Sequence, residues 1–175
     1  MAESVDRNQV VLVDRDGAAI GVADKLAAHR APGTLHLAFS VFLFDTDGRL
    51  LVQRRAAAKY HFPLVWANSC CSHPQPGEEL VAAAESRVAE ELGLKITLNT
   101  VGSFVYRAKD DVSGLVEHEF DWVLVGALDD VPRPDPAEVA EVRLVSKDEL
   151  DEALRTLEFA PWFAVALKIA RNARR

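Results

Sequence analysis

Short runs of apolar residues separated by turn residues dominate the first part of the chain and predict β-hairpins. Gln9–Val13 is apolar and β-branched, Asp14–Gly17 is a turn signal, and Ala18–Val22 can pair back on the first strand. The apolar run Leu35–Phe44 and its partner Leu50–Arg54 predict a second hairpin. We therefore expect the chain to begin with antiparallel strands.

A helical period of apolar residues appears over Glu78–Leu92, where the hydrophobic positions repeat along one face. Gly93 follows directly and is typical of a helix end. A shorter helix is predicted over Lys25–His29 and is broken by Ala31–Gly33. The apolar face of the longer helix consists of Leu80, Ala84, Val88 and Leu92.

The second half of the chain mixes strands with helices. Lys95–Tyr106 and Glu117–Leu128 predict two strands, and Glu141–Val145 predicts a shorter one. A capped helix follows over Lys147–Leu157, and Pro161 opens the last helix. Strands interspersed with a few helices predict a mixed α/β sandwich with helices on both sides of a sheet.

Composition and charge narrow the class of protein. A length of 175 residues with 49% hydrophobic content fits one globular domain. No apolar run approaches the roughly 20 residues that span a bilayer, and Met1–Asp6 lacks the start of a secretory signal, so the cytoplasm is the expected compartment. The net charge of -7 argues against nucleic acid as a partner. It still allows an anionic small molecule in a locally basic pocket.

Residues that could carry chemistry are densest in Trp66–Pro74. Cys71 and His73 are two positions apart and share one side of an extended segment. A buried thiol and a structural histidine are the commoner interpretation of such a pair. His29 and His36 add two candidate imidazole ligands for a transition metal.

Two carboxylates, Glu117 and Glu119, share one face of a predicted strand. Phe120 and Trp122 alternate with acidic residues, and this alternation alone places the carboxylates on the solvated face of an edge strand. Three histidines and two glutamates together, however, suit a divalent cation, either Mn²⁺ or Mg²⁺ in an octahedral site or Zn²⁺.

Basic residues are spread over several segments and could meet at a diphosphate. Lys25 lies near His29, Arg55 and Lys59 follow a predicted strand, and Arg87 lies in the long helix. The side chains of Arg87 and its neighbour four positions later project together, most commonly as a surface ion pair. The alternative places that carboxylate on a metal and the guanidinium on a phosphate.

Six motifs occur along the chain in the order Leu35–Ser40, Leu51–Arg55, Trp66–Pro74, Tyr106–Ala108, Glu117–Glu119 and Phe159–Trp162. Together they resemble the type I isopentenyl-diphosphate isomerases of the Nudix-like superfamily. The resemblance runs from about Lys25 to the C-terminal helix. The ending Glu90–Leu94 fits a Nudix box, but Ser86 and Arg87 stand where a Nudix hydrolase has Arg-Glu.

The resemblance implies a Nudix-like αβα sandwich of the α/β (α+β) class, with a mixed β-sheet and an N-terminal β-hairpin extension. It implies a single domain over residues 1–175, with a Nudix core at about 34–166. Residues 1–33 would form the extension and contribute to the site.

Two metal sites are implied by the same resemblance. Glu91 matches the residue that holds Mg²⁺ against the substrate diphosphate. Mn²⁺, or another divalent ion such as Zn²⁺, would occupy a second site. The residues that match its ligands are His29, His36, His73, Glu117 and Glu119.

The resemblance further assigns Cys71 as the essential cysteine, which forms an acid/base pair with Glu119, supported by Tyr106. We expect Glu119 to donate a proton and Cys71 to accept one, although the residues are compatible with either order. Trp162 would line the hydrocarbon end of the site together with Tyr106. The positions that match substrate anchors are Lys25, Arg55, Lys59 and Arg87.

The implied activity is the interconversion of isopentenyl and dimethylallyl diphosphate in isoprenoid biosynthesis, by adding one proton and removing another. The expected partner is this small-molecule substrate, with no nucleic acid, no membrane and a monomer as the working assumption. Two alternatives stay open. A Nudix hydrolase of nucleoside diphosphates is supported by Glu90 and Glu91 and opposed by Arg87. A metal-bound diphosphate sensor would bind without turnover.

Overall fold

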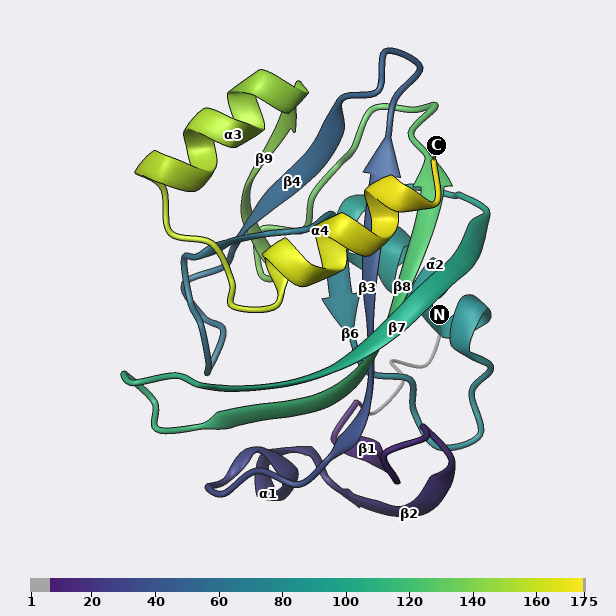
Figure 1. Ribbon diagram of the computed structural model, residues 1–175, viewed down its shortest axis with the longest axis vertical. Helices are drawn as coiled ribbons and strands as arrows, with labels where there is room; N and C mark the ends of the chain where they lie inside the picture. The colour runs from purple at the N-terminus through teal and green to yellow at the C-terminus, as the bar shows by residue number, and fades with distance from the viewer. Residues whose placement is uncertain (1–6, 175) are drawn as a thin grey trace.

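A long central strand, β3 (His36–Phe44), organises the sheet of the computed structural model, which describes residues 7–174 (Figure 1). It pairs in parallel with β8 (Val116–Ala127) and antiparallel with its other neighbours. These neighbours are β1 (Gln9–Val13), β4 (Leu50–Arg55) and β6 (Cys70–Ser72). The remaining strands are β2 (Ala19–Asp24), β5 (Trp66–Ala67), β7 (Leu98–Lys109) and β9 (Val139–Val145). The segment Met1–Asp6, where no secretory signal was predicted, and Arg175 lie outside the described residues.

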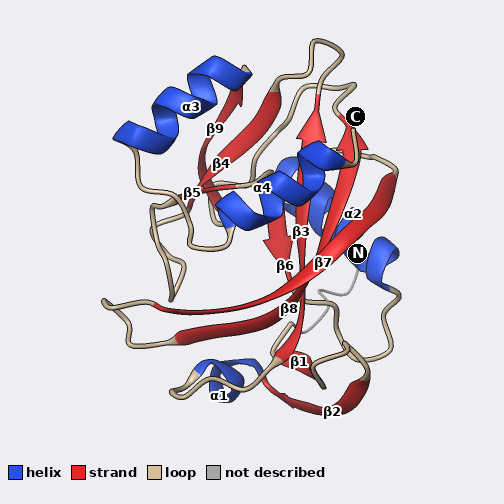
Figure 2. Ribbon diagram, in the orientation of Figure 1, coloured by secondary structure: helices blue, strands red, loops and turns tan. Residues whose placement is uncertain are grey.

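Helices cover both faces of this mixed sheet, as Figure 2 shows for α2 behind it and α4 in front. The alternation of side chains along β3 explains the arrangement. Phe39 and Val41 pack in the cluster that contains the apolar face of α2, whereas Phe42 and Phe44 pack against α4. The predicted sandwich with helices on both sides is therefore confirmed. The helices are α1 (Lys25–His29), α2 (Leu80–Leu92), α3 (Lys147–Thr156) and α4 (Phe163–Asn172).

The acidic residues of β8 do not lie on a solvated edge, as their alternation with aromatic residues had predicted. Glu117 is 2% exposed and Glu119 is 6% exposed. The reason is that β8 lies between β3 and β7, and its successive residues Val123 and Leu124 pack in apolar clusters on the two sides of the sheet. In a strand of this kind, alternation of polar and apolar residues no longer separates core from solvent.

The N-terminal hairpin of β1 and β2 places α1 at the start of the central strand. Leu12 of β1 is the register partner of His36 in β3. Asp24 caps α1, its carboxylate accepting a hydrogen bond from the Ala27 amide at 2.8 Å. His29, the last residue of α1, is consequently held beside β3 and β8.

The last helix begins at Phe163 rather than at Pro161. Trp162, which precedes it, is buried and donates a hydrogen bond from its indole N–H to Asn68 Oδ1 at 3.0 Å.

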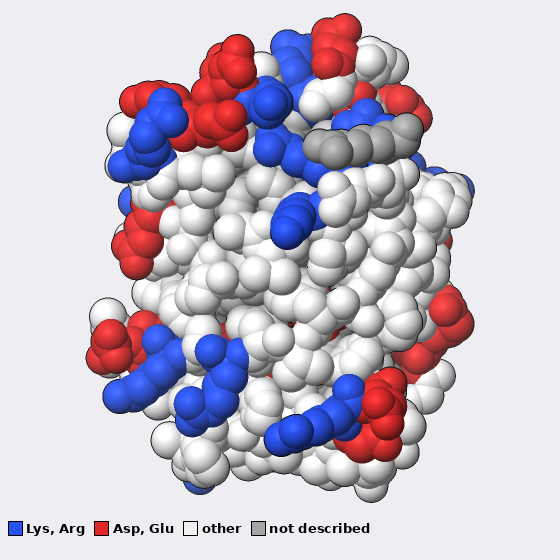
Figure 3. All heavy atoms as spheres, in the orientation of Figure 1, with Lys and Arg blue, Asp and Glu red and all other residues white. Residues whose placement is uncertain are grey.

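The face drawn in Figure 3 carries its charged side chains mainly near the two ends of the molecule, with both signs present at each end. Its middle is largely uncharged, and the exposed apolar side chains of the chain include Val105 of β7 and Val165 of α4. Among the described residues, no helix has the length and apolar character needed to cross a membrane.

Gly33 occupies a crowded left-handed position, so Gly33→Ala should lose more stability than Gly48→Ala. Both glycines have positive φ, +83° and +79°, and a side chain at either costs about 1–2 kcal/mol. A Cβ on Gly33 would lie 2.6 Å from Val116 Cγ1, whereas Gly48 has no neighbour within 4 Å. The overlap adds about 1–3 kcal/mol. Urea unfolding measures both variants, and equal losses would contradict the packing argument.

Candidate active site and metal centre

Three histidines and two glutamates, predicted as ligands from distant parts of the chain, meet at one point. His29 ends α1, His36 begins β3, and His73 directly follows β6. Glu117 and Glu119 come from β8, where Glu119 is the register partner of His36. All five side chains are buried, and each offers one ligand atom within 4.8 Å of all the others.

Backbone carbonyls orient two of the imidazole rings toward this cluster. The Nδ1 atom of His29 donates to the Lys25 carbonyl at 2.6 Å, and Nδ1 of His36 donates to the Thr34 carbonyl at 2.7 Å. A carbonyl has no proton to give, so each ring carries a proton on Nδ1 and turns Nε2 inward. The Nε2 atoms of His36 and His73 are 3.3 Å apart. A cation between these nitrogens would be a partner for both.

The carboxylates complete a donor set that fits a divalent ion. Glu117 Oε2 lies 3.0 Å from His29 Nε2, and Glu119 Oε1 lies 2.8 Å from His73 Nε2. Burial lowers the pKa of His73 to about 3, so this ring is neutral and able to act as a ligand. Burial alone would raise the pKa of Glu117, but the adjacent His61 and His29 hold that pKa well below its usual range. Three imidazole nitrogens and two carboxylate oxygens suit Mn²⁺, Zn²⁺ or a similar ion.

A cavity of about 260 Å³ opens beside the cluster and is shared by the predicted acid/base pair. Cys71 and Glu119 both line it, although they come from different strands, β6 and β8. The other predicted site residues along its wall are Lys25, Arg55, Lys59, His73, Arg87, Tyr106, Glu117 and Trp162. The structure thus brings the side chains predicted as the acid/base pair to one cavity.

Polar and aromatic contacts fix the two groups within the cavity. The Tyr106 hydroxyl donates to Glu119 Oε2 at 2.5 Å, and Arg55 Nη1 donates to the Cys71 sulfur at 3.6 Å. Burial raises the pKa of the Cys71 thiol to about 12, and Arg55 opposes that rise. The Tyr106 and Trp162 rings, 5.9 Å apart between centroids, form an apolar wall next to them.

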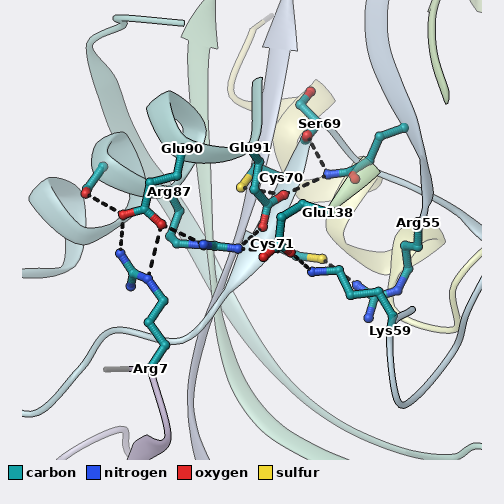
Figure 4. Close-up of polar contacts among 12 residues, drawn as sticks. Arg7, Arg55, Lys59, Ser69, Cys70, Cys71, Arg87, Glu90, Glu91 and Glu138 are labelled. Atoms are coloured by element: carbon teal, nitrogen blue, oxygen red, sulfur yellow. Dashed lines mark hydrogen bonds and ion pairs between the residues drawn. The ribbon is translucent and has the colours of Figure 1, made fainter. Parts of the chain in front are cut away.

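Two basic residues of the cavity, Arg87 and Lys59, are paired with nearby acids (Figure 4). Arg87 bridges Glu90, at 2.6 Å from its Nη1, and Glu91, which contacts its Nη2. Glu138 contacts Lys59 and lies 3.4 Å from Arg87 Nη2. The carboxylates therefore hold these two side chains at the cavity, where an incoming anion would compete with the acids for them.

Glu91 is set back from the cavity, and its predicted Mg²⁺-holding role stays a prediction. The side chain is 2% exposed and does not line the cavity wall. One carboxylate oxygen contacts Arg87, and the other lies 3.3 Å from Gln53 Nε2 and 3.5 Å from the Cys70 sulfur. The pair with Arg87 is buried, unlike the surface ion pair that is common at this spacing.

Sequence reasoning missed two residues of the site, His61 and Glu138. His61 lies in the loop between β4 and β5, lines the cavity and contacts the Glu117 carboxylate. Glu138 precedes β9 and neutralises Lys59. The string Tyr60–Pro63, with aromatic residues crowded before a proline, was the signal that could have drawn attention to His61.

Comparison with known structures supports the fold. A crystal structure from Deinococcus radiodurans is similar with a TM-score of 0.73 and 18% identity, covering 92% of this chain and 98% of that one. The MutT protein from Methanosarcina mazei Go1 is similar with a TM-score of 0.65 and 16% identity, and the match covers 81% of this chain and 96% of that one. At these identities the likeness concerns the fold alone.

Sequence comparison is more specific. The NUDIX domain family matches residues 34–163. An isopentenyl-diphosphate Delta-isomerase of Nocardia farcinica is 54% identical over 168 residues, which cover 95% of this chain and 96% of that protein. An isopentenyl-diphosphate Delta-isomerase from Halorhodospira halophila is 46% identical over 157 residues, which cover 88% of this chain and 90% of that protein. The chain belongs to the NUDIX domain family and, within it, to the isopentenyl-diphosphate Delta-isomerases.

Proposed function

We propose that this protein interconverts isopentenyl diphosphate and dimethylallyl diphosphate by protonation and deprotonation. The observation that carries the proposal is the placement of a thiol, Cys71, and a carboxyl group, Glu119, on the wall of one cavity. The relatives that share most of the chain carry the name of this isomerase. The reaction belongs to isoprenoid biosynthesis.

The chemistry requires one acid and one base at different carbons of a short chain. Protonation of the terminal alkene carbon gives a tertiary carbocation at the neighbouring carbon. The CH₂ group that joins this cationic carbon to the diphosphate-bearing carbon then loses a proton, and the new double bond forms there. No atom other than hydrogen is gained or lost. Because the reaction is reversible, Cys71 and Glu119 each act as acid in one direction and as base in the other.

Glu119 is held for this task by its neighbours. Tyr106 donates to one carboxylate oxygen at 2.5 Å, and His73 contacts the other at 2.8 Å. A divalent ion bound by the five predicted ligands would make a protonated Glu119 more acidic. The Tyr106 hydroxyl restricts rotation of the carboxyl group, so its proton is delivered to a fixed place.

The carbocation needs protection from water and nucleophiles. Trp162 is 3% exposed, and its ring lies 5.7 Å from Phe62 and 5.9 Å from Tyr106 between centroids. An aromatic face next to a cation stabilises it by about 0.5–2 kcal/mol. This apolar wall excludes water from the hydrocarbon end of the site.

The diphosphate would bind at the basic part of the wall, through Lys25, Arg55, Lys59 and Arg87. Mg²⁺ commonly bridges phosphate oxygens and one or two carboxylates, and Glu91 is the proposed carboxylate. For Glu91 to serve, the Arg87 guanidinium has to release one of its oxygens. A diphosphate that draws Arg87 toward the cavity would free that oxygen.

The proposed partner is the small-molecule substrate alone, and a cytoplasmic location and a monomeric state stay predictions.

Nucleoside diphosphate hydrolysis is opposed by Arg87, whose ion pairs with Glu90 and Glu91 fill the place where a Nudix hydrolase has a carboxylate. A non-catalytic sensor leaves the shared placement of Cys71 and Glu119 unexplained.

Cys71→Ala should lower turnover of isopentenyl diphosphate by about 10²–10⁴-fold, because one proton-transfer group is removed. The matched control is Cys70→Ala, the adjacent cysteine, which is fully buried in the α2 cluster and does not line the cavity. Its turnover should stay close to that of the unaltered protein. Formation of the allylic product in the presence of Mg²⁺ measures both. Full activity in Cys71→Ala would refute the mechanism.

Glu119→Gln should reduce turnover far more than substrate affinity. The amide retains the shape of the side chain and an oxygen ligand but exchanges no proton, while the basic residues that bind the diphosphate are unaltered. Steady-state kcat is compared with the dissociation constant from equilibrium binding. The proposal fails if diphosphate affinity collapses while turnover remains near normal.

A further inference from the structure

We propose that His61 is a positioning residue of the metal centre, which restricts Glu117 to a single ligand oxygen. The inference rests on the metal site of the proposed function and assigns a role to a loop residue outside the predicted ligand set. His61 does not belong to the group of five whose ligand atoms lie within 4.8 Å of one another. It contacts one of those five from the outside.

The two oxygens of Glu117 have different partners. Oε2 lies 3.0 Å from Nε2 of His29 and faces the cluster, whereas Oε1 contacts Nε2 of His61. The Nδ1 atom of His61 is buried and has no hydrogen-bond partner among the described residues. With its proton on Nε2, His61 donates to Oε1 and leaves only Oε2 directed at the ion.

The loop around His61 is anchored from several sides. Arg55 donates from Nη2 to the His61 carbonyl at 3.1 Å and from Nε to the Phe62 carbonyl at 3.0 Å. The Phe62 amide donates to Asp110 Oδ2 at 3.1 Å. The His61 ring is 6% exposed and packs at 4.5 Å from the Tyr60 ring, between centroids. A ring held in this way is suited to fix the position of a carboxylate.

The contact between His61 and Glu117 should affect metal affinity, because a ligand carboxylate can bind an ion through one oxygen or through both. Without a partner for Oε1, Glu117 would keep a buried oxygen unsatisfied or turn both oxygens toward the ion. Hydrogen bonds from outside the ligand set typically contribute about 10–100-fold to metal affinity. The same loop also holds Arg55 at the cavity, so it connects the metal centre to the basic wall.

The test is the affinity of the metal-free protein for Mn²⁺ alone, with free Mn²⁺ measured by electron paramagnetic resonance. His61→Phe keeps a ring but removes the donor, and its dissociation constant should rise by about 10–100-fold. His61→Gln places an amide N–H near the position of Nε2 and should recover most of the lost affinity. His61→Leu replaces the Phe variant if the latter does not fold.

His118→Phe is the matched control. His118 lies on β8 between the two ligand glutamates, but its ring contacts the Gly33 carbonyl at 3.0 Å. Its variant should bind Mn²⁺ like the unaltered protein. Unchanged affinity in His61→Phe, a Gln variant as weak as the Phe variant, or an equal loss in the control overturns the role of His61. Absence of Mn²⁺ binding in the unaltered protein would instead refute the proposed metal centre itself, and with it this inference.

Discussion

The structure depends on burying two carboxylates among imidazole rings at the junction of β3 and β8. Burial of a charge is costly unless a partner compensates it. Here the parallel pairing of β3 with β8 sets His36 opposite Glu119, and α1 and β6 bring His29 and His73 to the same point. The proposed divalent ion would neutralise the carboxylates and bind between the imidazole nitrogens. The N-terminal hairpin, the central strands and the His61 loop all serve to assemble this centre.

The metal centre and the cavity have different roles in the proposed reaction. Glu119 belongs to both, since it is a ligand candidate and also lines the cavity beside the aromatic wall, where Tyr106 donates a hydrogen bond to it. Cys71 belongs to the cavity alone, with Arg55 as its polar neighbour. In the proposed reaction the basic residues would hold the charged end of the substrate, and the short hydrocarbon would lie between the thiol and the carboxyl group. Positioning of this kind supplies a large part of the rate of such reactions.

Local patterns predicted the order of strands and helices well, because apolar periodicity and turn residues act over a few positions. The helix over Leu80–Leu92 and the strand Gln9–Val13 followed directly from them. The predicted environment of Glu117 was wrong, because the pairing of β8 with β7 on one side and with β3 on the other is a tertiary feature that its local pattern does not record. His61 escaped notice for the same reason, since its role depends on contacts with β8 that no local motif records. The ligand set itself came from resemblance, not from spacing.

The most direct test of the account is a crystal structure of the protein grown with Mn²⁺, with anomalous diffraction recorded at the manganese absorption edge. The account predicts one strong peak bonded to the Nε2 atoms of His29, His36 and His73 and to one oxygen each of Glu117 and Glu119. An anomalous peak elsewhere, with these five side chains still contacting one another directly, would contradict it.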